Sequence, residues 1–369
     1  MRKKNILAFH RVIAPYRIDF FNSLGAKYDL KVVMFWRNLK DQTFDYKKIE
    51  DRLLFEYSYC VKDELGTLFW LKSIWELLSN SNQDIVYVGE YGLSTIIAIL
   101  HRFITRSKYK IVTIVDDSYN MISENNHFTK KHRYAVNILT PLLDEVQVVE
   151  PRVEHWYKAK FNKGICFPII ADEIYSRQIL KRVLPISERY VKEYMLEGKR
   201  VLLFVGRLVS LKNIEFAINA FNKANVPNSV FVIVGSGELE FRLKEIVSPF
   251  DNILLVGRFE GDELYAGYNV AHVFTLPSLQ EPFGAVTNEA LSAGCFSLIS
   301  SAAGSNCLIK SGVNGFIIDP FDESTYIRNL ISLLESSKPL ALPMTVKENL
   351  MQVTFRDYMS KIYNRLDLF

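Results

Sequence analysis

Residues 277–294 constrain the fold more than any other part of the chain, and they read PSLQEPFGAVTNEALSAG. The apolar run His272–Leu276 precedes them and is typical of a buried strand in a parallel sheet. Pro282 and Gly284 then interrupt the chain, and apolar residues recur at helical spacing over 286–293. The pattern therefore predicts a strand, a loop and a helix whose first turn presents unpaired N–H groups and a positive dipole to an anion.

Two glutamates in this stretch are candidates for ligand binding. Glu281 falls in the loop, and Glu289 falls on the packed stripe of the helix. A carboxylate beside a packed face is unfavourable unless something hydrogen-bonds it, and a ribose diol is a suitable partner. The alternative is that Glu281 is solvated and Glu289 only borders the core. That alternative is favoured for either residue alone, whereas the pair set around Pro-Phe-Gly favours function.

The length of 369 residues fits two domains of roughly 150 residues each. A hydrophobic share of 49% and a charged share of 23% are typical of globular domains and exclude a disordered chain. The net charge of +4 gives no support for nucleic-acid binding. No apolar run approaches the ~18 residues that span a bilayer, and the basic start leads into a strand rather than a signal peptide. The cysteines show no CxxC spacing, which predicts buried thiols in a reducing cytoplasm.

Strands and helices alternate in two series. The first series of strands is expected at 5–9, 30–35, 53–59, 84–88, 110–115, 145–149 and 164–167. Residues 168–185 are expected to be an irregular hinge, Ser187 to cap the next helix, and 346–366 to form a closing helix. The second series of strands is expected at 200–205, 229–234, 253–256, 272–276, 296–299 and 315–318. This alternation predicts an α/β fold with two Rossmann-like domains facing a central cleft, where ligands bind beyond the C-terminal strand ends.

Two cations open the second series. Arg207 lies just beyond the end of the strand at 200–205, after Gly206, and Lys212 precedes the next helix. Two cations at a strand-to-helix turn suit a diphosphate. The alternative is that both are ordinary surface cations, but their placement makes the functional interpretation stronger.

A glycine turn and an Arg-Phe pair follow later strands. Gly235-Ser236-Gly237 does not complete a dinucleotide-binding fingerprint, because Glu240 stands where the third glycine would be. The sequence instead predicts a tight turn beside the ligand. Arg258 and Phe259 follow another strand and could border a base, although such a pair is weak evidence.

Together these motifs resemble the nucleotide-binding domain of family 4 glycosyltransferases, which have the GT-B fold. The matching motifs are Gly206-Arg207 with Lys212-Asn213, Gly235-Ser236-Gly237, and Glu281-Pro-Phe-Gly with Glu289-Ala-Leu. The opening Ala14-Pro15-Tyr16-Arg17 with Phe20-Phe21-Asn22 is similar to bacterial surface-polysaccharide transferases of this family. The motifs span about half of the chain and are specific when taken together.

The resemblance implies a retaining, metal-independent transfer from a nucleotide-diphosphate sugar to a glycan or lipid-linked acceptor, in the synthesis of lipopolysaccharide or a related surface polysaccharide. It implies that Arg207 and Lys212 hold the donor diphosphate, that Glu281 contacts the donor sugar, and that Glu289 binds the ribose. The further donor-binding candidates are Gly206, Gly235, Arg258, Pro282, Phe283, Gly284, Ala285 and Val286. The candidates on the acceptor or sugar side are Tyr16, Arg17, Glu90, Asp116 and Asp117.

By the same resemblance, residues 1–170 form an acceptor-binding domain and residues 171–345 a nucleotide-sugar-binding domain. Residues 346–369 form a C-terminal helix that packs back on the first domain. The resemblance implies that no metal is needed, and the sequence shows no metal-ligand cluster. No cofactor is expected either, because the nucleotide-diphosphate sugar is the donor substrate.

The first half departs from the family pattern. Many members carry a glycine-rich loop after the first strand, where this chain has Arg11–Pro15, and a histidine after the strand that here ends in Asp116-Asp117. His127 is too far along the chain to replace that histidine. Asp116 or Asp117 could contact sugar or acceptor, or could cap a loop.

Basic stretches at 102–110 and 130–133, with Trp70 and Trp75 nearby in sequence, are compatible with a cytoplasmic protein at the inner face of the plasma membrane. The alternative is solvated basic faces and core tryptophans. Two further functions stay open: a GT-B sugar-nucleotide epimerase or hydrolase, and a carbohydrate-binding subunit without turnover.

Overall fold

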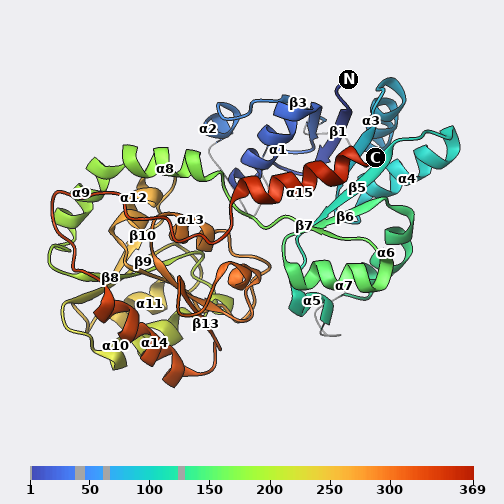
Figure 1. The fold of residues 1–369 in the computed structure, drawn as a ribbon. Helices are drawn as coiled ribbons and strands as arrows, with labels where there is room; N and C mark the ends of the chain where they lie inside the picture. Colours follow the sequence, from blue (N-terminus) through green and yellow to red (C-terminus); the bar gives the residue numbers. More distant parts are fainter. Residues whose placement is uncertain (1, 38–45, 61–66, 124–128) are drawn as a thin grey trace. The chain divides into compact units, whose positions relative to one another are not determined.

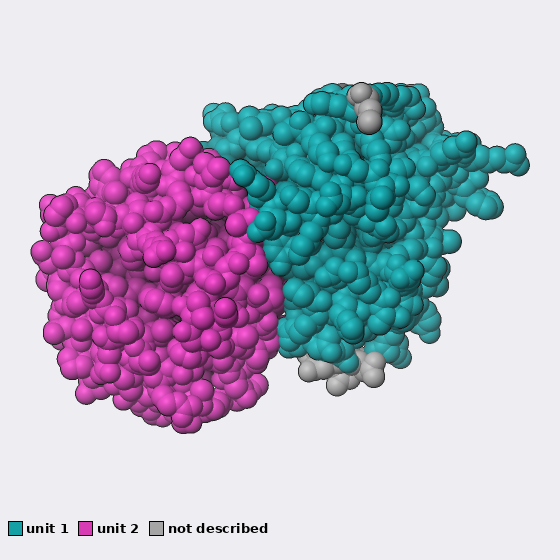
Figure 2. Space-filling model, viewed as in Figure 1, with its two compact units in different colours: residues 1–169, 356–369 teal, residues 170–355 magenta. Residues whose placement is uncertain are grey.

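The computed structural model describes residues 2–37, 46–60, 67–123 and 129–369. The chain divides into unit 1, residues 1–169 and 356–369, and unit 2, residues 170–355 (Figure 2). Each unit is built on a parallel β-sheet with helices on both faces (Figure 1). Parallel strands covered on both faces need continuous apolar runs, which is why the strands stand out in the sequence.

Unit 1 has a seven-stranded sheet in the order β3-β2-β1-β4-β5-β6-β7. Its strands are β1 (Asn5–His10), β2 (Asp29–Met34), β3 (Glu56–Tyr59), β4 (Ile85–Gly89), β5 (Lys110–Val115), β6 (Glu145–Val148) and β7 (Ile165–Cys166). The strand order reverses between β1 and β4, which pair in parallel. Such a reversal opens a crevice at the C-terminal strand ends.

The helices of unit 1 lie on two faces of this sheet. They are α1 (Pro15–Lys27), α2 (Tyr46–Glu50), α3 (Thr67–Asn80), α4 (Leu93–Thr105), α5 (Tyr119–Ser123), α6 (Lys130–Leu139), η1 (Thr140–Leu142), α7 (Pro151–Phe161) and α15 (Phe355–Asp367). One core packs the sheet against α3, α4, α6 and α7, and Trp70 and Trp75 are partly buried against it. On the other face, the ring of Phe20 in α1 packs on Tyr87 and Phe167. Helix α15 contacts α1 there, because the Tyr363 hydroxyl donates to the Ser23 carbonyl at 2.7 Å.

Unit 2 has a six-stranded sheet in the order β10-β9-β8-β11-β12-β13. Its strands are β8 (Arg200–Val205), β9 (Ser229–Val234), β10 (Ile253–Gly257), β11 (Val273–Leu276), β12 (Phe296–Ser300) and β13 (Gly315–Ile318). Its helices are α8 (Glu173–Arg182), α9 (Leu184–Glu193), η2 (Ser210–Lys212), α10 (Ile214–Ala224), α11 (Glu240–Val247), α12 (Asp262–Val270), α13 (Val286–Ser292), η3 (Gly304–Leu308) and α14 (Glu323–Ser336). The order reverses between β8 and β11.

Two expectations about the segments that flank unit 2 are wrong. Helix α8 occupies most of the expected hinge, because Asp172 caps it by accepting from the N–H groups of Ile174 and Tyr175. Ser187 lies inside α9, where its hydroxyl donates to the Val183 carbonyl, and does not cap a helix.

The closing helix also begins later than expected, at Phe355 rather than 346. The backbone of the preceding residues makes long-range hydrogen bonds in place of helical ones. Arg177 donates to the Lys347 carbonyl, the Leu350 N–H donates to the Leu291 carbonyl at 2.9 Å, and Asn314 donates to the Leu350 carbonyl at 3.1 Å. These contacts hold the segment extended along unit 2.

Candidate functional site

The predicted donor residues gather at one edge of the unit 2 sheet. Arg207 and Lys212 follow β8, Gly235 follows β9, and Glu281 follows β11. Strands β8 and β11 are neighbours at the reversal of strand order, and the Leu279 N–H donates to the Leu211 carbonyl at 2.8 Å, which joins their loops directly. The crevice at this reversal is where open α/β sheets bind ligands.

Lys212 and Glu281 form an ion pair across these two loops. Their side chains are only 14% and 15% exposed, so solvent screens the pair weakly. Arg207 is exposed, and within the described part of the chain it forms no ion pair. The edge therefore carries one cation held by a carboxylate and one cation available to an anionic ligand.

The loop that carries Glu281 is fixed by the loop after β12. The Glu281 N–H donates to the Ala302 carbonyl at 3.3 Å, and the Gly304 N–H donates to the Glu281 carbonyl at 3.2 Å. Gly284 has a φ of 94°, and a Cβ there would lie 2.6 Å from Leu276 Cδ2. Glycine is therefore required for the loop to turn into α13.

Three backbone N–H groups at this turn are available for a ligand. Among the described residues, the N–H groups of Gly284, Ala285 and Val286 have no hydrogen-bond acceptor. They precede or begin α13, in the position where a helix leaves its first donors unsatisfied.

Glu289 lies on α13 and is partly buried. The Tyr268 hydroxyl of α12 donates to Glu289 Oε2 at 2.8 Å. Desolvation raises the pKa of Glu289 to about 7, and the hydrogen bond from Tyr268 opposes that shift. Tyr268 is not predictable as a site residue, because nothing in the spacing of the residues in α12 and α13 shows which side chains of the two helices meet.

The remaining donor candidates have mixed surroundings. Gly235 packs tightly on the β8 loop, since a Cβ there would lie 1.9 Å from the Gly206 carbonyl oxygen. Arg258 forms an exposed ion pair with Glu260, and Phe259 stacks on Tyr190 with ring centroids 5.2 Å apart. Pro282 is exposed and Phe283 is buried. The structure thus brings Gly206, Gly235, Lys212 and Glu281 together by direct contacts or joined loops, and it gives Arg258 a different charged neighbour.

In unit 1, the predicted residues also lie at the C-terminal edge of the sheet. Arg17, in the first turn of α1, is only 2% exposed and forms an ion pair with Asp116 at the end of β5. The Arg17 guanidinium also lies 5.8 Å from the ring centroid of Tyr16. Burial of the Tyr16 hydroxyl and the nearby Asp116 charge raise its pKa.

Glu90 and Asp117 extend this acidic edge. Glu90 follows β4 with a φ of 50°, and desolvation together with Asp116 and Asp117 raises its pKa. Asp117 is 7% exposed and lies 3.1 Å from His132 Nε2 of α6. His132 was not predicted as a site residue. Its hydrogen bond to Asp117 raises the pKa of His132. His127 lies outside the described residues.

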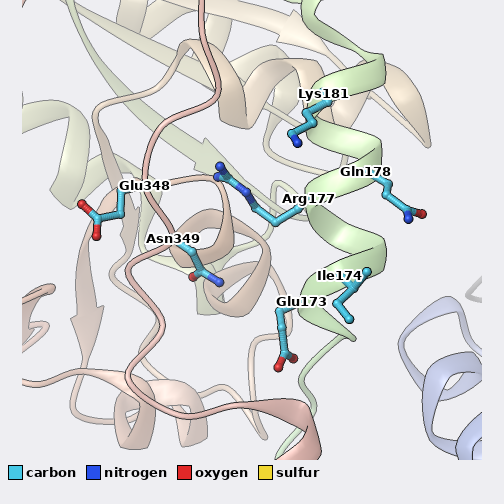
Figure 3. Close-up of a pocket in the computed structure, with 7 residues that line it drawn as sticks. All are labelled: Glu173, Ile174, Arg177, Gln178, Lys181, Glu348 and Asn349. Carbon is cyan, nitrogen blue, oxygen red and sulfur yellow. The ribbon is translucent and has the colours of Figure 1, made fainter.

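A pocket elsewhere in unit 2 contains none of the predicted site residues. It is lined by Glu173, Ile174, Arg177, Gln178, Lys181, Glu348 and Asn349 (Figure 3). Its Arg177 donates to the Lys347 carbonyl, and its Glu173 accepts from the Phe355 N–H at 3.1 Å. These polar groups anchor the extended 347–355 segment.

The described residues contain no metal-ligand cluster and no helix that could span a membrane. No group of three or more His, Cys, Asp or Glu side chains there is arranged to hold a metal ion. None of the described helices combines the length and the apolar character needed to cross a membrane.

Comparison with known proteins finds sequence similarity in the second half of the chain. Residues 187–349 match the family model of glycosyl transferases group 1. An uncharacterized glycosyltransferase of Methanocaldococcus jannaschii is 36% identical over 128 residues, which is 34% of this chain and 33% of that protein. The UDP-Gal:alpha-D-GlcNAc-diphosphoundecaprenol alpha-1,3-galactosyltransferase of Escherichia coli is 34% identical over 161 residues, 41% of each chain. The similarity thus spans well under two thirds of these relatives.

The fold extends the similarity to the whole chain. The structure of Anabaena HepE in complex with UDP and glucose superimposes with a TM-score of 0.74 at 16% identity, covering 99% of this chain and 100% of HepE. This likeness and the two Rossmann-like units confirm the expected fold class. Residues 187–349 are therefore similar to glycosyl transferases group 1, and the chain as a whole has the GT-B fold.

Proposed function

We propose that this chain is a retaining glycosyltransferase that moves a sugar from a nucleotide-diphosphate sugar to a glycan or lipid-linked acceptor in surface-polysaccharide synthesis. The observation that carries the proposal is the Lys212–Glu281 pair beside the exposed Arg207, at the reversal of strand order in unit 2. Two cations and a row of open N–H groups at one sheet edge suit a diphosphate.

In this mechanism, the donor diphosphate is the leaving group and gains charge as the bond to the sugar breaks. Arg207 and Lys212 stabilise that charge, and the N–H groups of residues 284–286 hold phosphate or sugar oxygens. Glu281 keeps Lys212 in place before the donor binds. It then offers a carboxylate to the sugar, whose transition state is oxocarbenium-like.

Glu289 binds a part of the donor that does not react. Its Oε2 accepts from Tyr268, so its second oxygen and remaining lone pairs can accept from a ribose diol. In unit 1, Glu90, Asp116 and Asp117 offer acceptors for hydroxyls of the sugar or of the acceptor glycan. His132 orients Asp117 through the hydrogen bond between them.

The relatives suggest which donors to test first. The Escherichia coli relative is named for UDP-galactose and a diphosphoundecaprenol-linked acceptor, and the HepE structure contains UDP and glucose. We therefore place uridine-diphosphate sugars first and a polyprenyl-linked acceptor second, with the protein acting at the inner face of the plasma membrane.

Calorimetric titration of the purified chain with nucleotide diphosphates and their sugars tests the donor site. We expect one diphosphate class to bind more tightly than its monophosphate, and Arg207→Ala to remove most of that difference. Equal affinity for monophosphate and diphosphate would exclude a diphosphate site at Arg207.

Activity should persist in a strong chelator, because two side-chain cations replace the divalent ion that many nucleotide-sugar enzymes use. Transfer rates are measured with and without EDTA after extensive dialysis. A rate lost in EDTA and restored by magnesium or manganese would assign a metal to Asp116 and Asp117 and contradict this part of the proposal.

Donor affinity should fall as the pH drops below about 7. Desolvation raises the pKa of Glu289 from 4.5 to about 7, so the carboxyl is protonated in the free protein at lower pH and accepts fewer ribose hydroxyls. The donor Kd should then rise up to about tenfold per pH unit below that pKa. Glu289→Gln should make the Kd independent of pH over this range.

The raised pKa of Glu289 has the opposite effect on folding stability, which decreases with rising pH while donor affinity increases. A carboxyl whose pKa is raised by folding stabilises the fold while it is protonated, and this contribution is lost as the pH rises from about 4.5 through about 7. The wild-type Tm without donor should therefore decline over that range more steeply than the Tm of Glu289→Gln. Identical pH profiles for the two proteins would contradict the shifted pKa.

A further inference from the structure

Helix α4 exposes an apolar face to solvent. Its exposed large side chains are Leu93, Ile96, Leu100, Phe103 and Ile104. At the helical rotation per residue they fall within an arc of about 100°. Phe103 is 83% exposed and Ile104 is 63% exposed, while Ile97 and Ala98 on the same helix pack into the core of unit 1. The helix thus has an apolar face in addition to the one that it buries.

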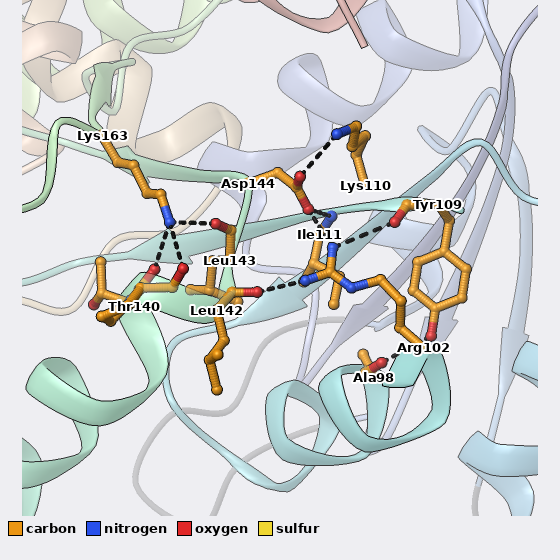
Figure 4. Close-up of polar contacts among 11 residues, drawn as sticks. Ala98, Arg102, Tyr109, Lys110, Ile111, Thr140, Leu142, Leu143, Asp144 and Lys163 are labelled. Carbon is orange, nitrogen blue, oxygen red and sulfur yellow. Dashed lines mark hydrogen bonds and ion pairs between the residues drawn. The ribbon is translucent and has the colours of Figure 1, made fainter. Parts of the chain in front are cut away.

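A second exposed apolar row lies on α6 and η1. It consists of Tyr134, Ile138 and Leu142, spaced four residues apart. Arg102 connects the two rows, because its guanidinium donates to the Leu142 carbonyl at 2.5 Å and to the Asp144 carboxylate (Figure 4). Lys110 also pairs with Asp144, at 3.1 Å. The end of α4 is therefore fixed beside η1.

The charge around these rows is mainly positive. Segments 92–110 and 129–142 contain no Asp or Glu, and their cations are Arg102, Arg106, Lys108, Lys110, Lys130, Lys131 and Arg133. Asp144 forms ion pairs with two of these cations, Arg102 and Lys110. Arg106, Lys108, Lys130 and Lys131 are exposed, and none of these four forms an ion pair with another described residue. Apart from Asp144, no acid among the described residues pairs with Arg102, Lys110 or the four exposed cations that flank the apolar rows.

We propose that this α4–α6 surface, made of the two apolar rows and the four exposed cations, binds the face of an anionic lipid bilayer. Apolar side chains can enter the headgroup region while lysine and arginine attract acidic lipids. Exposed Phe and Ile argue against a purely electrostatic partner such as nucleic acid, and the lack of acids argues against a protein partner of mixed charge. Helix α4 has 13 residues, too few to span a bilayer, so it lies on the surface.

Membrane binding by this surface deepens the proposed function. Only the reason for the binding rests on that function, since a lipid-linked acceptor resides in a bilayer. The surface keeps the basic stretches that the sequence indicated for membrane contact but replaces the tryptophans as the apolar part. Trp70 and Trp75 are packed against the core of unit 1, whereas Phe103 and Ile104 are exposed.

Cosedimentation of the full chain with vesicles tests the surface. Vesicles of phosphatidylcholine with phosphatidylglycerol should bind the protein, and vesicles of phosphatidylcholine alone should bind it far more weakly. Phe103→Ser combined with Ile104→Ser should weaken binding to the anionic vesicles at least tenfold, since two exposed apolar side chains lose their burial in lipid. Phe241→Ser is the matched control, because Phe241 is 75% exposed on α11 of unit 2.

The cationic part is tested with Lys130→Gln combined with Lys131→Gln. Each cation near an anionic surface strengthens binding about fivefold, so the pair should weaken it about 25-fold at low salt. Lys192→Gln combined with Lys244→Gln removes two exposed charges from unit 2 and should have little effect. Added salt should reduce the difference between the two pairs.

Three results would overturn the proposal: no binding of the wild type to anionic vesicles, equal binding of the Phe103 and Ile104 variant, or a concentration-dependent dimer that this variant abolishes. The last would assign the surface to a second copy of the chain. Transfer to a water-soluble acceptor is measured in parallel, and it should be unchanged in every variant. A failure in vesicle binding alone thus leaves the proposed function standing.

Discussion

Replacing Lys212 or Arg207 by alanine should lower kcat about 100- to 1,000-fold while the fold survives. Both cations stabilise charge that develops on the departing diphosphate, and losing one such contact in a preorganised site is worth about 2.7–4 kcal/mol of the barrier. Arg207 is exposed, and among the described residues it makes no ion pair, so its removal should leave the Tm unchanged. Lys212 is 14% exposed and pairs with Glu281, so its removal leaves a carboxylate unpaired and should also lower the Tm.

The measurement is steady-state kinetics of both variants with melting curves. Arg328→Ala is the matched control, because Arg328 is an exposed cation on α14 of the same unit and, among the described residues, hydrogen-bonds just to Thr325, at 3.0 Å. It should keep wild-type rates. Near-normal kcat in both test variants would remove the two cations from the mechanism.

Glu281→Gln and Glu289→Gln should affect different kinetic constants. Glu281 lies beside Lys212 in the loop that meets the sugar, so its charge acts as the positive centre forms, and we expect kcat to fall about 10- to 100-fold. Glu289 lies on α13 and bonds Tyr268, so it should bind an unreacting part of the donor. Glutamine there keeps one acceptor but loses the charge, so we expect the donor KM to rise about tenfold with kcat retained.

Donor-dependent kinetics distinguish this division of roles from a purely structural one. If both glutamates only support the fold, both variants would keep kcat and KM and change only the Tm. Tyr268→Phe provides an internal check, because it removes the hydroxyl that donates a hydrogen bond to Glu289 Oε2. This variant should raise the KM for the sugar donor, as Glu289→Gln does. An unchanged kcat in Glu281→Gln, or a lost kcat with unchanged KM in Glu289→Gln, would contradict the assignment.

The strands could be read from the sequence because parallel strands are buried on both faces. The apolar runs at Lys110–Val115 and Arg200–Val205 coincide with β5 and β8. The helix breakers at Pro282 and Gly284 likewise coincide with the turn between β11 and α13. Because a parallel sheet places the C-terminal ends of its strands at one edge, the loop residues after each strand are expected there, as observed within each unit.

The remaining features depend on contacts between distant segments. Helix α8 was not predicted, although Asp172 is a typical capping residue. Pro168 and Pro185 flank the segment and indicated irregular structure. The helix at 346–366 was overextended because its periodicity says nothing of Leu291 and Asn314, which bind the backbone of residue 350. Tyr268 and His132 meet Glu289 and Asp117 only through tertiary packing. The exposure of Phe103 is equally invisible in sequence, since a helical apolar stripe normally predicts burial.

Product analysis tests the central claim most directly. The purified chain is incubated with the tightest-binding nucleotide-diphosphate sugar and a panel of glycan and polyprenyl-linked acceptors, and the product is examined by mass spectrometry and NMR. We predict a glycosylated acceptor whose new linkage keeps the anomeric configuration of the donor, with one nucleoside diphosphate released per transfer. Free sugar alone, an epimerised donor, an inverted linkage, or donor binding without turnover would each contradict a retaining glycosyltransferase.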